Sequence, residues 1–367
     1  MQLFDRLGDD YEEVVVCHDA PSGLRAVVAI HSTALGPALG GTRFYPYRSE
    51  DDAFEDVLRL AEGMTYKSAA AGLDLGGGKA VIIGDPATTK NETLLRVYGR
   101  FIDSLGGRYI TAEDVGTSQT DMDLIFRETR NVTGVSRAFG GSGDPSAATA
   151  YGLLWAMKAV LETLDGVDEL TGRRVVVSGV GKVGTALVRH LVEERADVTV
   201  ADVDDTAVAR VVKDFGVQPV PVNDAHTVDS DIFSPCALGG ACNEKTIAGM
   251  RCRAIVGSAN NQLATPDDAL RLADRGILYA PDFVVNAGGV INIAEELVGY
   301  HRERAYANIC RIADTTKRVL ATAQRHCITP TAAAEALAHR RIADVGGAAG
   351  RIRSFRSPAR RPGRHPD

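Results

Sequence analysis

The sequence predicts an α/β protein of two domains, the second of which holds a doubly wound parallel sheet. The chain of 367 residues is long enough for two domains of ordinary size. Its first half mixes strand and helix patterns without a regular rhythm, whereas strands and helices alternate cleanly after about residue 140. Such alternation is typical of parallel strands joined by helices that cover both faces of the sheet.

Composition and charge exclude several other classes of protein. With 45% hydrophobic and 24% charged residues, the bulk of the chain is neither disordered nor collagen-like nor a coiled coil. The net charge of −7 argues against a nucleic-acid partner. No apolar run approaches the roughly 18 residues that span a bilayer, and the N-terminus lacks the pattern of a signal peptide. We therefore expect a cytoplasmic protein with no membrane partner.

The charge is unevenly placed along the chain. Residues 351–367 hold six arginines and one acid, so this tail carries +5 and residues 1–350 carry −12. We expect residues 347–367 to form a basic, disordered tail outside the folded domains. The six cysteines are sparse and form no CxxC pair, which indicates reduced thiols. No His, Cys, Asp and Glu residues have the spacing of a metal site, so no metal is expected.

In the first half, runs rich in Val and Ile predict strands at 13–17 and 24–31, joined by a Pro-Ser-Gly turn. A helix is predicted over 49–68, because Ser49 suits the N-cap, acids fill the first turn and apolar residues recur three and four apart. This spacing puts Lys67 on the inward face near the helix end. The remaining predicted elements are a strand at 79–83, a helix at 91–105 and a strand at 108–112.

Small and turn-forming residues at 139–149 predict a linker between the two domains. A helix is expected next, at 150–164. The alternating elements after it are strand 174–178, helix 183–195, strand 197–201, helix 205–215 and strands 231–234, 253–256 and 277–280. A long amphipathic helix is expected over 290–325. The sequence therefore predicts a first domain over 1–139 and a second over 140–325.

A glycine motif opens the second domain. Gly179, Gly181 and Gly184, with Lys182 and Val183 between the last two, form GxGxxG after a Val-rich strand and before a helix, the context of a Rossmann dinucleotide site. The free N–H groups of the helix N-terminus would hold the pyrophosphate of the cofactor. The next strand ends at Asp202, the position of a carboxylate that binds the adenosine ribose. Because Asp204 and Asp205 follow without a cation, NAD is favoured over NADP.

A second group of residues has the composition of a catalytic site. Lys67 and Lys79 stand twelve apart, and Lys79 follows three glycines at the start of a strand. A lysine in apolar surroundings is suited to general base chemistry, because burial lowers the pKa of an amine. Asp114 and the pair 260–261 (Asn-Asn) each follow a predicted strand, where α/β sheets bind their ligands. From spacing alone, either lysine could equally be a surface residue, and isolated loop Asp and Asn residues are more often turn residues.

Seven segments stand here in the order and spacing of a known family: LGPALGGTR, GLDLGGGKAVI, TAEDVGTS, SGVGKVG, FSPCALGG, GSANNQL and PDFVVNAGGVIN. Over roughly residues 12–345 the chain resembles the leucine/valine branch of the Glu/Leu/Phe/Val amino acid dehydrogenases. The resemblance implies an N-terminal substrate domain with a mixed sheet, a Rossmann NAD domain and a catalytic cleft between them. It also implies that a C-terminal helix at about 326–346 completes the first domain and that the protein is a homo-oligomer.

The resemblance assigns roles to residues on both sides of the cleft. Lys67 would hold the α-carboxylate of the amino acid, Lys79 would be the catalytic base that activates water, and Asp114 would transfer protons to and from the substrate nitrogen. The backbone of Gly40 and Gly41 would line the carboxylate and the water. The remaining implied contacts are Asn260 and Asn261 to substrate and cofactor, without a choice between them, and Ser146, Thr149, Pro235, Cys236 and Ala237 along the cofactor.

The residues that match the side-chain pocket of the family point to an aliphatic substrate. Glutamate-specific relatives carry a lysine before the Gly-Gly pair, whereas this chain has Leu39, against which a buried glutamate carboxylate would be unpaired. The other pocket positions are Met64, Ala112, Val290 and Ile293. We therefore expect NAD-dependent oxidative deamination of valine, leucine and isoleucine. The same reaction on phenylalanine, or a non-catalytic sensor of NAD or amino acids, remains as an alternative.

Overall fold

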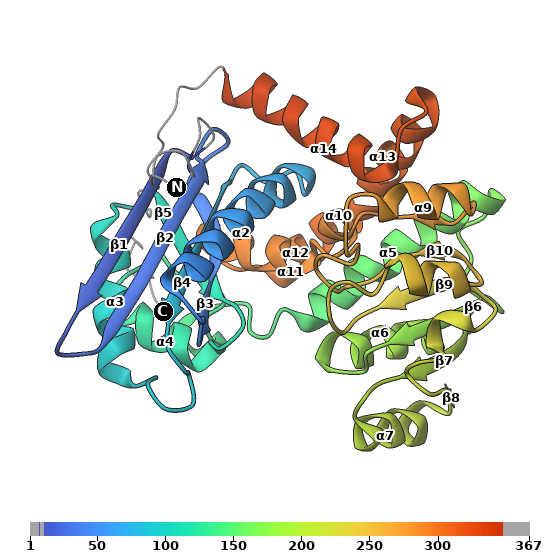
Figure 1. Cartoon of the computed structure of the whole chain (residues 1–367), viewed down its shortest axis with the longest axis horizontal. Helices are drawn as coiled ribbons and strands as arrows, with labels where there is room; N and C mark the ends of the chain where they lie inside the picture. Colours follow the sequence, from blue (N-terminus) through green and yellow to red (C-terminus); the bar gives the residue numbers. More distant parts are fainter. Residues whose placement is uncertain (1–6, 8–10, 348–367) are drawn as a thin grey trace, which may run out of the picture.

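A five-stranded mixed sheet forms the first half of the computed structural model, which describes residues 7 and 11–347 (Figure 1). The sheet has the order β1-β2-β4-β3-β5. β1 and β4 run antiparallel to β2, whereas β3 runs parallel to β4 and β5. The mixed sheet is as expected. Its strands are β1 (Glu13–Asp19), β2 (Leu24–Ser32), β3 (Ala38–Tyr45), β4 (Gly76–Ile83) and β5 (Tyr109–Glu113).

Helices cover both faces of this sheet. α2 (Glu50–Ala70) begins as predicted, since the Ser49 side chain accepts a hydrogen bond from the backbone of Asp52 at 3.0 Å. Its apolar face packs on β2 and β4, and this leaves Lys67 in the last turn at the edge of the sheet. The opposite face of the sheet packs on α3 (Glu92–Ser104) and α4 (Gln119–Phe126). α4 has only eight residues and carries no long periodic pattern, so the sequence did not predict it.

The second sheet is wholly parallel and has the order β11-β10-β9-β6-β7-β8. Valines of its central strands pack against α5 (Ser146–Asp165) and α6 (Lys182–Glu193) in the largest apolar core of the molecule. The doubly wound prediction is therefore confirmed. The strands are β6 (Arg174–Ser178), β7 (Asp197–Ala201), β8 (Gln218–Pro219), β9 (Ser230–Pro235), β10 (Cys252–Ile255) and β11 (Leu278–Tyr279), and the other helices are α7 (Asp205–Phe215), α8 (Glu244–Gly249) and α9 (Asp268–Asp274).

Two predicted elements are wrong in extent. α5 begins at Ser146, four residues before the predicted start, so the linker is shorter than its composition suggested. The single helix predicted over 290–325 is broken, because Gly299 adopts a φ of +86° that a right-handed helix does not allow. The pieces are α11 (Gly288–Ala294), a 3₁₀ turn (Glu295–Val298), α12 (Arg302–Cys310) and α13 (Ile312–His326), preceded by the short α10 (Asp282–Val285).

The chain returns to the first half at its end. α14 (Pro330–Arg341) leaves α13 and packs against α2 (Figure 1). Arg341 fixes this contact, since its guanidinium donates to the carbonyl of Gly72 at 3.0 Å and pairs with Asp74 at 2.8 Å. The two sheets fall on either side of residue 140, but the predicted domain limits themselves stay predictions. The predicted basic tail lies outside the described residues, apart from Gly347.

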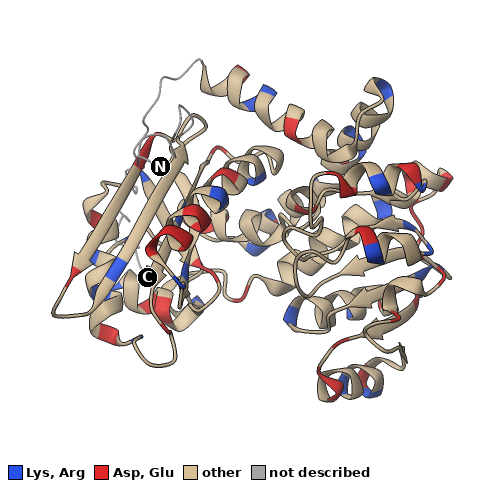
Figure 2. Ribbon diagram, viewed as in Figure 1, with Lys and Arg blue, Asp and Glu red and all other residues tan. Residues whose placement is uncertain are grey.

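Charged residues of both signs are interspersed over both halves of the molecule (Figure 2). Among the described residues, no helix is both long and apolar enough to cross a membrane. The same residues contain no group of three or more His, Cys, Asp and Glu side chains arranged to hold a metal ion. The cytoplasmic location stays a prediction.

Candidate active site

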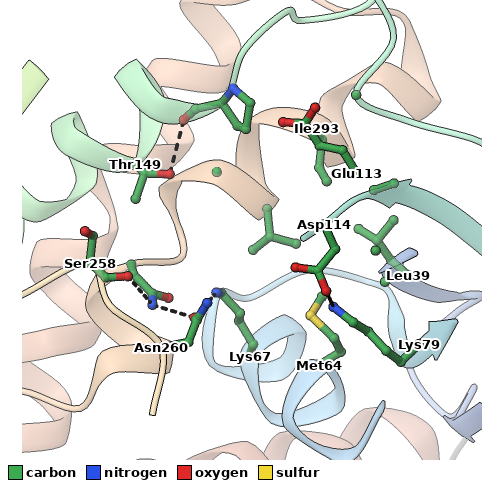
Figure 3. Close-up of a pocket in the computed structure, with 18 of the residues that line it drawn as sticks. Leu39, Met64, Lys67, Lys79, Glu113, Asp114, Thr149, Ser258, Asn260 and Ile293 are labelled. Carbon is green, nitrogen blue, oxygen red and sulfur yellow. Dashed lines mark hydrogen bonds and ion pairs between the residues drawn. The ribbon is translucent and has the colours of Figure 1, made fainter. Parts of the chain in front are cut away.

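A pocket of about 300 Å³ lies between the two halves and is lined by residues of both. Most residues that the sequence nominated for substrate binding and catalysis meet there (Figure 3). The predicted residues that line it are Leu39, Gly40, Gly41, Met64, Lys67, Lys79, Ala112, Asp114, Thr149, Val183, Asn260, Val290 and Ile293. The lining residues that sequence reasoning missed are Glu113, Gly134, Pro145, Ser258, Asn286 and Gly289.

A short ion pair in the pocket joins Lys79 Nζ and Asp114 Oδ2, at 2.6 Å. Lys79 lies in β4 and only 8% of its side chain is exposed, while Asp114 follows β5 directly. Because β3 runs between these two strands, the pair spans β3. The ion pair crosses β3 at Gly40 and Gly41. A Cβ on Gly41 would come within 2.9 Å of Asp114 Cβ, and a Cβ on Gly40 would come within 1.7 Å of the carbonyl of Gly78.

Opposing effects set the charge of Asp114. Burial alone would raise the pKa of this carboxyl, but the neighbouring Lys79 and Arg43 lower it below its ordinary value. Figure 3 shows one oxygen directed at Lys79 and the other facing the interior of the pocket. Asp114 is therefore an anion placed to receive a cationic or hydrogen-bonding group of a ligand.

The second lysine reaches the pocket from the end of α2. Lys67 Nζ donates to Asn260 Oδ1 at 3.4 Å, and this oxygen also accepts from Asn286 Nδ2 at 2.9 Å. Burial lowers the pKa of Lys67 to about 8, an effect that the charge of Asp282 opposes and that of Lys79 reinforces. A ligand carboxylate at this amine would stabilise its charged form and complete its hydrogen bonds.

The structure distinguishes the two neighbouring asparagines. Asn260 faces the pocket and contacts Lys67, whereas Asn261 is absent from the lining and adopts a left-handed backbone with φ of 53°. The carbonyl of Asn261 accepts from the backbone of Gly240 at 2.8 Å, so this residue shapes the loop. Asn286 lies in the segment PDFVVNAGGVIN, and nothing in its local pattern marks it as a pocket residue.

The glycine turn before α6 fits a dinucleotide on three observations. Gly179 has a φ of +108°, as a tight turn requires. A Cβ on Gly184 would lie 1.9 Å from the carbonyl of Gly179, so only glycine allows the helix to pack this closely on the strand. Gly181, the N-cap of α6, faces open space, which leaves room for a phosphate at the free N–H groups.

Other predicted cofactor residues surround the glycine turn. Asp202, just past β7, accepts from the backbone of Val180 at 2.7 Å and so fixes the turn against the strand end. Cys236 and Ala237 pack against the turn, because a Cβ on Gly179 would come within 2.8 Å of both residues. Lys182 pairs with Asp144 of the linker at 2.8 Å. Ser146 begins α5, and its backbone donates to that same Asp144 at 2.9 Å.

Two carboxylates near the connection between the two halves were not predicted as site residues. Glu113 lines the pocket, where burial and the negative charge of Asp144 raise its pKa. Glu296, in the 3₁₀ turn after α11, accepts hydrogen bonds from the backbone of Gly134 at 3.0 Å and from the backbone and hydroxyl of Ser142 at 2.8 and 2.6 Å. Contacts of this kind join segments far apart in the chain, so no local signal could have revealed them.

Two family models match this chain. The model of the Glu/Leu/Phe/Val dehydrogenase dimerisation domain matches residues 12–131, and that of Glutamate/Leucine/Phenylalanine/Valine dehydrogenase matches 140–210 and 202–350. The chain belongs to the Glu/Leu/Phe/Val dehydrogenase family. Leucine dehydrogenase of Geobacillus stearothermophilus is 52% identical over 100% of this chain and 98% of its own. Valine dehydrogenase of Streptomyces virginiae is 53% identical over 94% and 97%.

The solved structures of this dehydrogenase family support the same assignment. L-tryptophan dehydrogenase from Nostoc punctiforme has a TM-score of 0.81 and 41% sequence identity, and the match covers 92% of this chain and 97% of that one. The family resemblance that the sequence motifs carried is thereby confirmed, and the protein is an amino acid dehydrogenase.

Proposed function

We propose that this dehydrogenase performs NAD-dependent oxidative deamination of branched-chain L-amino acids to 2-oxo acids and ammonium. The observation that carries the proposal is the meeting of Lys67, Lys79 and Asp114 in one pocket beside an apolar wall. A charged Lys67 suits the α-carboxylate of an amino acid, the anion of Asp114 suits its α-amino group, and Lys79, in contact with Asp114, is placed to act as a base. The apolar wall suits a side chain without charge. The 52% and 53% identity to leucine and valine dehydrogenases supports the same substrate class.

The walls of the pocket restrict the substrate side chain. The residues on this side are Leu39, Met64, Ala112, Val290 and Ile293. A glutamate or lysine side chain would bring a charge against Leu39, which is fully buried, and would lose its hydration without gaining a partner. Because one methylene changes discrimination by only about 1–3 kcal/mol, valine, leucine and isoleucine should all be substrates.

In the proposed mechanism Lys67 binds the α-carboxylate and so orients the substrate in the cleft. Asp114 accepts a hydrogen bond from the α-amino group and stabilises the cationic iminium that forms at the same nitrogen. Lys79, as a neutral amine, removes a proton from the water that attacks the iminium carbon. Lys79 passes this proton to Asp114, which it contacts at 2.6 Å, and Asp114 delivers it to the nitrogen of the carbinolamine. Lys79 then removes the proton of the carbinolamine hydroxyl as the C–N bond breaks, so the 2-oxo acid forms and ammonia leaves, taking up this proton as ammonium. Closure of the two halves would exclude bulk water during these steps.

NAD fits the second half of the molecule as the cofactor of this reaction. When bound, it accepts a hydride from the substrate Cα. Gly181 and the N-terminus of α6 would hold its pyrophosphate, with Lys182 and Val183 in the same turn, and Asp202 would bind the adenosine ribose. The exposed Asp204 and Asp205 follow Asp202 without a neighbouring Lys or Arg in the sequence, so a 2′-phosphate would meet only negative charge. We therefore propose NAD rather than NADP.

We also propose that the protein is a cytoplasmic homo-oligomer. The dimerisation-domain model that matches residues 12–131 supports the assembly, and light scattering on the purified protein would give its mass. The activity is tested by following NADH absorbance with NAD⁺ and a panel of L-amino acids at alkaline pH. Fast turnover of valine, leucine and isoleucine is expected. Preference for phenylalanine or tryptophan would overturn the substrate assignment, and no NADH from any amino acid would overturn the enzyme assignment.

A further inference from the structure

A chain of alternating charges leads from the pocket toward the outer surface of the first half. Arg43, in β3, places Nε 3.3 Å from Asp114 Oδ2, the same oxygen that Lys79 contacts at 2.6 Å. On its other side, Arg43 donates to Asp56 Oδ2 of α2 at 2.8 Å. Lys79 and Arg43 therefore share one carboxylate, and Asp114 and Asp56 share one guanidinium.

The outer end of this chain is anchored by two further groups. Asp56 accepts from the hydroxyl of Tyr47 at 2.6 Å and pairs with Arg59 Nη2 at 2.8 Å. These contacts hold the pKa of Asp56 below its ordinary value, although burial opposes them. Arg43 is only 23% exposed and is thus held between two ionised carboxylates at a fixed distance from the pocket.

We propose that Arg43 is a positioning residue of the reaction. Its positive charge partly neutralises the carboxylate of Asp114, so that this carboxylate holds the proton of Lys79 less strongly. This inference rests on the proposed function, in which Lys79 acts as a neutral base. Both cationic nitrogens touch one oxygen, so they lie within about 6 Å of each other. At that separation in a partly buried site, the two like charges repel each other.

Other titratable groups lie around Lys79 and Arg43. Lys67 of α2 adds a second positive charge near Lys79, and Asp282 of α10 faces Lys67 from the second half. Glu113 lies beside Asp114 at the end of β5. The phenol of Tyr109 is buried nearby, and the charge of Asp114 contributes to raising its pKa. Arginine differs from all of these groups because its guanidinium keeps its charge at every working pH.

The test compares pH profiles of kcat/KM for leucine in variants that change the charge on either side of Asp114. Arg43→Gln removes a positive charge, so the acid limb should move to higher pH by about one unit. Asp56→Asn removes a negative charge next to Arg43, so the acid limb of the profile should move to lower pH. Arg43→Lys keeps the charge and should restore most of the wild-type profile. Arg48→Gln serves as the matched control, since Arg48 is exposed and pairs with Asp52 at 3.1 Å on the surface.

Opposite shifts from Arg43→Gln and Asp56→Asn are the expected result, because a loss of local structure would displace both profiles in the same direction or merely lower both maxima. Unchanged profiles, or shifts of the same sign, would overturn the inference while leaving the proposed function intact. If Arg43→Gln fails to fold, Asp56→Asn and Arg43→Lys still test the direction of the effect. A wild-type protein that oxidises no amino acid would overturn the proposed function first, and this inference with it.

Discussion

Glu296 and Ser142 form two hydrogen bonds although they lie 154 residues apart in the sequence. Ser142 lies on the connection that leaves the first half, and Glu296 lies on the segment after α11, which lines the pocket at Gly289, Val290 and Ile293. The same carboxylate also accepts from the backbone of Gly134 at 3.0 Å. One half-buried side chain thus joins both segments next to the pocket.

Removing this carboxylate should destabilise the protein. Glu296→Ala leaves three donors without an acceptor in a buried place, and we expect a loss of about 2–4 kcal/mol in the free energy of unfolding. Urea unfolding followed by circular dichroism gives this value. Glu303→Ala is the control, because Glu303 is exposed in the neighbouring α12. Equal stability of the two variants would show that Glu296 does not fasten the segments.

The lowered pKa of Lys67 predicts proton uptake when a carboxylate binds. Lys67 has a pKa of about 8, so its amine is mostly neutral at about pH 9 and charged at about pH 6.5. A ligand carboxylate raises this pKa. Binding of 4-methylpentanoate should therefore take up a proton at the higher pH and almost none at the lower one. Calorimetry in buffers of different ionisation enthalpy measures the uptake, and Lys67→Met should abolish it; uptake that persists in this variant assigns the proton elsewhere.

Two glycines of the same turn should respond differently to alanine. Gly184→Ala places a Cβ 1.9 Å from the carbonyl of Gly179, so we expect a large loss of thermal stability. Gly181→Ala meets only open space and should fold normally, but its methyl group would keep the pyrophosphate away from the backbone. A drop in NADH affinity of roughly tenfold or more is expected for Gly181→Ala, measured by fluorescence titration. Wild-type affinity in this variant would place the cofactor elsewhere.

The apolar wall predicts the direction of a specificity change. Val290→Ala removes two carbons from the pocket, so kcat/KM for valine should fall roughly tenfold, within the 1–3 kcal/mol that such contacts contribute. The kcat/KM for phenylalanine should rise relative to that for valine, because the enlarged pocket has space for a wider side chain. Initial rates of NADH formation for the two amino acids measure the ratio. A ratio equal to that of the wild type would remove Val290 from the wall.

Elements with a clear local pattern were predictable from sequence. Strands 174–178 and 197–201 and helix 205–215 agree to the residue with β6, β7 and α7, because each is bounded by turn residues and has an unbroken apolar period. The strand β3 was missed, since Gly40 and Gly41 have low intrinsic strand preference. Pairing on both sides, with β4 and β5, stabilises it instead.

The candidate site likewise contains residues that were predictable from sequence and residues that were not. Motifs identified Lys79 and Asp114, because each stands beside glycines or at a strand end in a segment that resembles the family, whereas Lys67 was placed by the helical spacing of 49–68. Arg43 ends one of those segments and Glu296 lies in none, but neither was assigned a role, because their surroundings are assembled from β3, β5 and α2 in one case and from both interdomain segments in the other. Long-range contacts of this kind depend on tertiary packing and cannot be found by local spacing.

Because α14 packs against α2, the N-terminal half of the fold is complete only after the C-terminal residues have been translated. Ala338 packs with Leu35 and Ala69 in one small core, and Arg341 pairs with Asp74. A ribosome releases the N-terminal half long before it has translated these C-terminal residues. Until then the outer side of α2, the helix that carries Lys67, lacks its cover. A nascent or truncated chain that stops before about residue 330 would expose this apolar surface and depend on chaperones to stay unaggregated.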